Sequence, residues 1–119
     1  MMAVSMSGVV AAEPGRVALP SGLEAMLQET IREEGPVLRF RYVAAGFDAA
    51  APLDEVAADL EHLCAADAAK RAAAEGMSAA RLVVSLADKP SEFGRFNPDV
   101  RQVFEAYRLE NGICIWEAF

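Results

Sequence analysis

The chain has 119 residues and carries 11 lysines and arginines against 18 acidic residues, which gives a net charge of −7. That balance argues against nucleic acid or an anionic membrane surface as the partner, because phosphate groups are bound by clustered basic side chains. No apolar run is long enough to span a bilayer, so no membrane insertion of the mature domain is expected. One histidine and two cysteines are too few for a Cys/His zinc site, and neither a metal nor another cofactor is predicted.

The N-terminal segment bears on the compartment. Residues 1–19 are expected to be a signal-peptide remnant or a flexible tail, ahead of a single domain over 20–119. Small residues at 10–12 (Val-Ala-Ala) before Glu13 are typical of a signal-peptidase site. The positively charged start of an export signal is missing, since the first basic residue is Arg16. A periplasmic or secreted location is predicted, with a cytoplasmic one as the alternative.

The first third of the domain favours β-structure. Prolines and glycines make 13–22 an entry loop. The apolar spacing over 23–32 suits a helix or a strand, and the short link at 33–36 favours a strand in a hairpin. A second strand is expected at 37–43, with alternate residues on one face, namely Leu38, Phe40 and Tyr42.

The strongest helix signal begins at Pro52, because proline suits the first helical turn. The helix is expected to run to about Ala74, in one or two pieces, and Gly76 is a natural stop. Apolar residues at three-and-four spacing form the stripe expected to be buried: Leu53, Val56, Ala57, Leu60, Leu63 and Cys64.

The last third predicts a buried strand and a hairpin. Leu82–Leu86 reads as a central strand, followed by a turn at 88–91 and a loop at 93–98 whose two phenylalanines are expected to tuck under it. Asn111–Gly112, between runs at 103–110 and 113–119, is a strong hairpin signal. The sum is an α+β domain, an antiparallel sheet of four to five strands with one main helix packed on one face.

The two cysteines, Cys64 and Cys114, are predicted to form a disulfide if the protein is exported. Cys64 would lie late on the helix and Cys114 on the last strand. Such a bridge would stabilise the fold by roughly 3–4 kcal/mol in the chain-entropy model. Two buried free thiols are the alternative.

Few residues point to chemistry. Asp88 and Glu92 bracket a turn and could bind a cation or a ligand, although ordinary turn hydrogen bonding is favoured. His62 does not form a dyad with Cys64, because residues two apart on a helix diverge. Acidic side chains of the last hairpin are expected to pair with Arg108: Glu105, Glu110 and Glu117.

Aromatic side chains near the C-terminus are the other candidates. Tyr107 and Trp116 would form a patch for a protein partner if both were exposed, but packing in the core is favoured. The same alternatives apply to Phe93, Phe96 and Phe119.

Four stretches resemble a small alphaproteobacterial family of secreted proteins with a domain of unknown function. They are residues 61–64, 85–94 and 104–117, with 39–44 as a weaker fourth. The resemblance covers most of the chain after Leu19 and implies export but no catalytic residues. Some family members carry the label acetolactate synthase. This chain lacks the Gly-Asp-Gly motif of that thiamine-diphosphate enzyme, and it has one strong helix where the regulatory subunit repeats a βαβ unit.

Three functions remain open. The first is an exported, non-catalytic domain that binds an unknown protein or small ligand. The second is a small enzyme or regulatory subunit, which would need one pocket that gathers His62, Asp88, Glu92 and Arg108. The third is an accessory subunit of an envelope complex. An exposed patch at Trp116 and Phe119 would favour this function.

Overall fold

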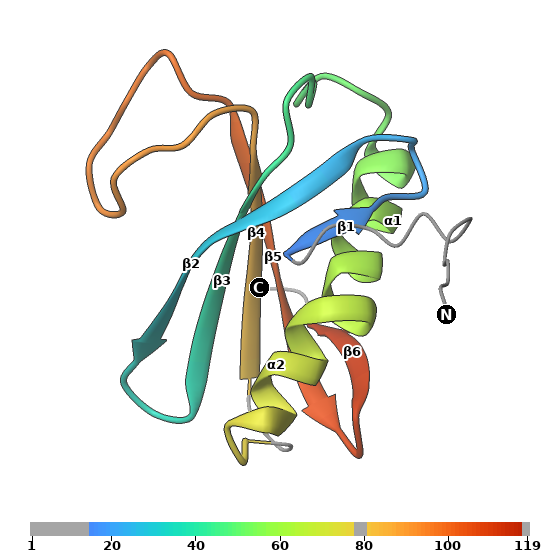
Figure 1. The fold of residues 1–119 in the computed structure, drawn as a ribbon, viewed down its shortest axis with the longest axis vertical. Helices are drawn as coiled ribbons and strands as arrows, with labels where there is room; N and C mark the ends of the chain where they lie inside the picture. Colours follow the sequence, from blue (N-terminus) through green and yellow to red (C-terminus); the bar gives the residue numbers. More distant parts are fainter. Residues whose placement is uncertain (1–14, 78–80, 118–119) are drawn as a thin grey trace, which may run out of the picture.

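The computed structural model describes residues 15–77 and 81–117. Six strands and one interrupted helix make up these ranges (Figure 1). In chain order they are β1 (Arg16–Ala18), β2 (Glu24–Glu33), β3 (Val37–Val43), α1 (Leu53–Leu63), the π-helical turn η1 (Cys64–Ala68), α2 (Ala69–Ala74), β4 (Arg81–Ala87), β5 (Gln102–Glu110) and β6 (Ile113–Glu117).

The sheet follows the chain order from β1 to β6. Neighbouring strands are antiparallel except for β3 and β4, which are parallel because the connection between them contains the whole helix. The expected α+β class is confirmed. The sheet has one strand more than the four to five expected, because the segment 13–22, predicted as a loop, contains β1.

The helix lies against one face of the curled sheet, and the core lies between them (Figure 1). The predicted face of β3 is fully buried there, as are the middle and the end of the helical stripe: Leu38, Phe40, Tyr42, Leu60, Leu63 and Cys64. Leu53 and Ala57 were expected in that stripe but are exposed, because they line an open hollow between α1 and β5 instead of packing against the sheet.

The helix changes to π-type winding at Cys64–Ala68. A π turn inserts one residue into the helical register. Asp67 in this turn accepts hydrogen bonds from the Tyr42 hydroxyl and from Arg71 Nε, both at 2.7 Å. Burial, and then the bond to Asp67, raises the pKa of the Tyr42 phenol well above its ordinary value. The helix is thus fixed to β3 by a polar contact at the edge of the core.

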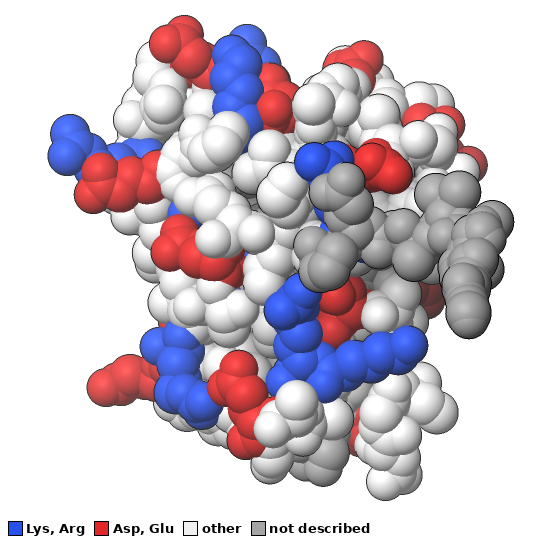
Figure 2. Space-filling model, in the orientation of Figure 1, with Lys and Arg blue, Asp and Glu red and all other residues white. Residues whose placement is uncertain are grey.

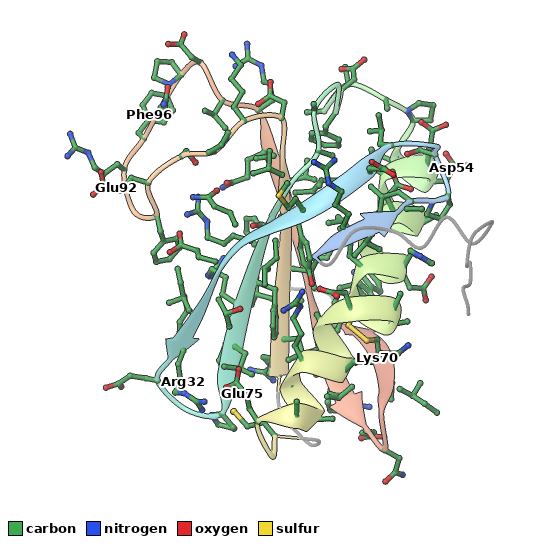
Figure 3. All side chains as sticks on the ribbon, in the orientation of Figure 1. Arg32, Asp54, Lys70, Glu75, Glu92 and Phe96 are labelled. Carbon is green, nitrogen blue, oxygen red and sulfur yellow. A yellow bond between two sulfur atoms is a disulfide. The ribbon has the colours of Figure 1, made fainter. Side chains whose placement is uncertain are left out.

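The predicted disulfide is present. Cys64 and Cys114 are joined with a Cα–Cα distance of 6.3 Å, so η1 is linked covalently to β6 (yellow bond in Figure 3). The Asn111–Gly112 turn has positive φ at both residues, as the hairpin requires. Among the described residues, no helix is long and apolar enough to cross a membrane.

The loop 88–101 lies beside the sheet face that does not carry the helix. Arg41, which is 4% exposed, pairs with Glu29 and donates hydrogen bonds to Ser91 O and Ser91 Oγ of this loop at 3.0 Å. Phe93 rests on Arg41, with 5.5 Å from the guanidinium carbon to the ring centroid. These contacts hold the N-terminal part of the loop on the sheet.

The expectation that both loop phenylalanines tuck under the loop is wrong. Phe96 is 91% exposed and points away from the body of the molecule (Figure 3). Phe93 is 44% exposed, because it covers arginine side chains on the surface instead of entering the core. Phe119 lies outside the described residues.

Candidate functional site

A hollow of about 300 Å³ lies between α1 and the last two strands. Its lining residues come from three elements: Ala57 and Glu61 of α1, Glu105 and Tyr107 of β5, and Trp116 of β6. Ala57 and Glu61 are one helical turn apart, Glu105 and Tyr107 alternate onto one face of the strand, and Tyr107 pairs with Trp116 across the ladder. Regular secondary structure therefore positions every side chain of this hollow.

Trp116 forms the outer wall and corrects a prediction. Packing in the core was favoured, but the side chain is 59% exposed. It belongs to the short edge strand β6, and helix α1 leaves the hollow between itself and this strand. The indole Nε1–H donates a 2.8 Å hydrogen bond to Glu105 Oε1, which fixes the ring.

Tyr107 forms the floor of the hollow. The residue is 2% exposed, as the core prediction required, yet its hydroxyl has no hydrogen-bond partner among the described residues. The hydroxyl keeps some solvent access, because no buried side-chain oxygen in these ranges is unsatisfied. Burial raises the pKa of the phenol, and the nearby Glu105 and Glu61 carboxylates raise it further. A polar atom at the base of the hollow is thus left for a ligand or for water.

The two carboxylates of the hollow have no basic partner among the described residues. Three other half-buried glutamates in the described ranges each pair with an arginine: Glu29 with Arg41, Glu33 with Arg39, and Glu117 with Arg81. Glu105 is also half-buried but accepts a hydrogen bond only from Trp116, which is neutral. The residues outside the described ranges include no lysine or arginine.

Charge is mixed on the one face of the molecule that the space-filling view shows (Figure 2). In the view of Figure 2, basic and acidic side chains are interspersed, without a large area of one sign. Arg32 and Glu75, for example, meet at 2.6 Å near the end of the helix (Figure 3). The hollow at Trp116 combines two carboxylates that have no ion-pair partner in the described ranges with two aromatic rings.

A second hollow, of about 290 Å³, continues the first along α1 and β5. The two share Ala57 and Glu105, and the second adds apolar walls from Leu53, Val56, Leu60, Val103 and Phe104. Leu53 is 87% exposed and Phe104 is 52% exposed. An apolar strip thus leads away from the carboxylates.

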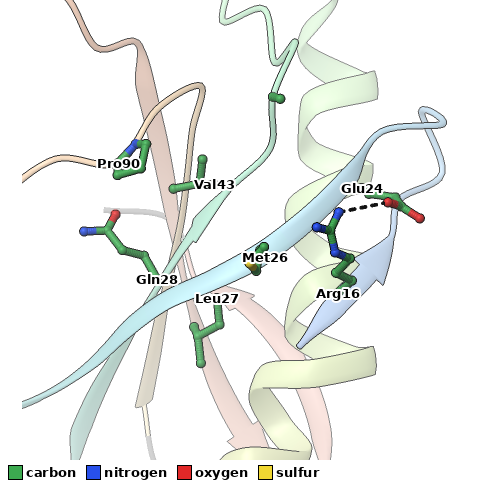
Figure 4. Close-up of a pocket in the computed structure, with 8 residues that line it drawn as sticks. Arg16, Glu24, Met26, Leu27, Gln28, Val43 and Pro90 are labelled. Carbon is green, nitrogen blue, oxygen red and sulfur yellow. Dashed lines mark hydrogen bonds and ion pairs between the residues drawn. The ribbon is translucent and has the colours of Figure 1, made fainter. Parts of the chain in front are cut away.

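A larger hollow, of about 390 Å³, lies elsewhere, beside β1, β2 and the end of β3 (Figure 4). Its wall is mainly apolar, with Met26, Leu27, Val43 and others. The polar groups at its rim already have partners: Arg16 pairs with Glu24, and the Gln28 amide donates to Ser91 O at 2.7 Å. It offers volume but fewer unsatisfied polar groups than the hollow at Trp116.

The other residues singled out from sequence do not meet. Asp88 Oδ1 accepts the Arg101 backbone N–H at 3.0 Å and so closes the loop 88–101. Glu92 lies far out on that loop, opposite Arg95 (Figure 3). Arg108 Nε pairs with Glu110 at 2.7 Å, and His62 is half-buried on α1. Within the described part of the chain, no group of three or more His, Cys, Asp or Glu side chains is placed to hold a metal ion.

Sequence reasoning missed Glu61 and misassigned Glu105. Glu105 was expected to pair with Arg108, and that expectation is wrong because residues three apart on a strand point to opposite faces. Arg108 pairs with Glu110 and Glu117, as expected. Alternation along the strand could have predicted this, because residues 105, 107 and 109 share one face and Glu105 therefore lies on the helix side with Tyr107.

Comparison with known proteins identifies a family but no function. No curated protein and no solved structure matches this chain. A family model described as a family of unknown function (DUF6497) matches residues 2–119. The chain therefore belongs to the DUF6497 family.

Proposed function

We propose that the protein is an exported, non-catalytic binding domain and that its binding site is the hollow between α1, β5 and β6. The observation that carries the proposal is the Tyr107 hydroxyl. The residue is 2% exposed and lines a concave surface walled by Trp116, and its hydroxyl keeps solvent access but has no partner in the described residues. Ligand sites typically combine a concave, mainly apolar wall with a few converging polar groups.

Binding is proposed over catalysis because the reactive side chains are dispersed. An acid–base or nucleophilic mechanism needs its groups within hydrogen-bond reach of one another or of one substrate. His62 lies on the helix, and Arg108 lies on the far face of the last hairpin. Asp88 lies at the base of the loop 88–101, and Glu92 lies far out on that loop. The hollow itself contributes two carboxylates, a phenol and an indole.

Export is supported by the disulfide. Stable disulfides form in oxidising compartments and are rare in the cytosol. The Cys64–Cys114 bond and the small residues at 10–12 therefore favour a periplasmic or secreted location. N-terminal sequencing of the native protein, together with thiol alkylation before and after reduction, tests this. An uncleaved chain with two free thiols would contradict it.

Binding in the hollow is tested by a matched pair of substitutions on α1. Ala57 and Ala58 are both exposed, but only Ala57 lines the hollow. Ala57→Leu fills part of it, whereas Ala58→Leu makes the same chemical change outside it. The single tryptophan, Trp116, reports on occupancy by its fluorescence.

The ligands for this test are a panel of short peptides and small molecules that span positive, negative and neutral charge. At least one class is expected to change the emission saturably in the wild type and in Ala58→Leu, and at least tenfold more weakly in Ala57→Leu. A panel that gives no saturable change, or one that is equal in the two variants, would overturn the proposal.

A further inference from the structure

We infer that the hollow at Trp116 is a receptor for an alkylammonium group, such as the side chain of a lysine. The inference rests on the proposed function and names the chemical class of its ligand. The charged head would lie at Glu61 and Glu105, and the aliphatic stem would lie along Trp116 and the apolar strip beyond it.

The first argument is the missing counter-charge. Burying part of a carboxylate without a positive partner is unfavourable, and the fold supplies an arginine to each other half-buried glutamate of the described ranges. Glu105 is left with the Trp116 N–H as its donor. Glu61 is exposed on α1, so it adds a second negative charge without a burial cost, and it has no ion-pair partner in those ranges. A cation from outside would complete this pair of acids.

The second argument is the nature of the wall. The face of an indole ring attracts cations more strongly than that of any other side chain, and phenol rings act in the same way. Trp116 and Tyr107 lie opposite each other on β6 and β5 and line the same hollow as the carboxylates. The unpartnered Tyr107 hydroxyl adds an acceptor for an N–H donor at the floor.

The third argument selects ammonium over guanidinium. A guanidinium binds a carboxylate best through two parallel hydrogen bonds, which occupy both oxygens. At Glu105, Oε1 already accepts the Trp116 indole N–H at 2.8 Å. An ammonium is a compact charge with three donors and needs one oxygen from each of several acceptors. The set here is Glu61, Glu105 and the Tyr107 hydroxyl.

The experiment is a titration followed by the emission of Trp116. The probes are n-butylammonium, Nα-acetyl-lysine methylamide, its uncharged isostere Nα-acetyl-norleucine methylamide, and Nα-acetyl-arginine methylamide. The two ammonium probes are expected to change the emission saturably, and the norleucine probe to bind at least tenfold more weakly. If the peptide backbone contributes, as for a lysine within a protein partner, the lysine probe binds more tightly than butylammonium. Equal affinities indicate a free amine as the source.

Charge variants localise the effect. Glu105→Gln and Glu61→Gln keep the shape of the hollow and are each expected to weaken ammonium binding by roughly tenfold, which is the effect of losing one charged hydrogen bond. Glu55→Gln is the control, because Glu55 is exposed on the same helix and lies outside this hollow. Circular dichroism checks that each variant is folded.

Two results would overturn the inference. One is binding of the norleucine probe as tightly as the lysine probe; the other is the same loss in Glu55→Gln as in Glu105→Gln. If a neutral or anionic panel member binds in an Ala57→Leu-sensitive manner while the ammonium probes do not, this inference fails and the proposed binding function stands. If no compound binds in a way that Ala57→Leu weakens, both this inference and the proposed binding function fail.

Discussion

Removing the Cys64–Cys114 disulfide is expected to lower the free energy of unfolding by about 4 kcal/mol. The bridge closes a loop with a sequence separation of 50. In the chain-entropy model, cross-linking a loop of that length removes about 14 cal/mol/K from the unfolded state, or about 4 kcal/mol at room temperature. That is a large fraction of the 5–15 kcal/mol typical of small domains.

The assay is urea denaturation of the oxidised protein and of the double variant Cys64→Ala/Cys114→Ala, followed by circular dichroism. With an m-value of about 1.5 kcal/mol/M, a loss of that size moves the midpoint down by roughly 2.5 M. A reductant is expected to have no further effect on the double variant, which serves as the control.

The reasoning would be refuted if the double variant lost less than about 1 kcal/mol. Such a result would mean that the unfolded chain already keeps η1 close to β6, or that the bridge strains the native state enough to cancel its entropic effect.

Three further predictions concern stability. Tyr42→Phe is expected to cost about 1–2 kcal/mol, because it leaves half-buried Asp67 without one donor, whereas Tyr107→Phe is expected to change stability by less than about 0.5 kcal/mol, because its hydroxyl has no partner in the described residues; urea denaturation compares them. The contribution of the two phenols to the free energy of unfolding is expected to be constant up to about pH 10 and to fall above it, because burial raises both phenol pKa values and the unfolded chain ionises first; phenolate absorbance should rise together with loss of the circular dichroism signal, and ionisation before unfolding would contradict this. Arg41→Met is expected to cost roughly 2–3 kcal/mol and to speed amide exchange in the loop 88–101, because it removes the loop's anchor and leaves Glu29 unpaired; unchanged exchange there would count against the anchoring role.

The regular elements were largely predictable because each has a local physical signal. The helix has Pro52 before its first turn and a periodic apolar stripe, and β3 alternates cleanly. Asn111–Gly112 specifies its own turn. These signals depend on a few adjacent residues, so the sequence carries them completely.

The remaining features depend on tertiary geometry. Three-residue β1 has no periodic signal of its own and is a strand only because β2 pairs with it. The π turn at Cys64–Ala68 and the exposure of Trp116 depend on where the helix ends relative to the sheet. Tyr107 and Trp116 were both identified from sequence as candidates, but Glu61 joins them only because α1 lies beside β5.

The most direct test of the central claim is the Trp116 indole N–H signal in a proton–nitrogen correlation spectrum, which contains one such signal because the chain has one tryptophan. The indole proton is hydrogen-bonded to Glu105, so a cation that binds this carboxylate must shift the indole signal. We expect n-butylammonium to shift this signal saturably, together with the backbone amides of Ala57 and Glu61, and an uncharged alcohol of the same length to leave it in place. An indole signal that does not move, or that moves equally with both compounds, would contradict the account.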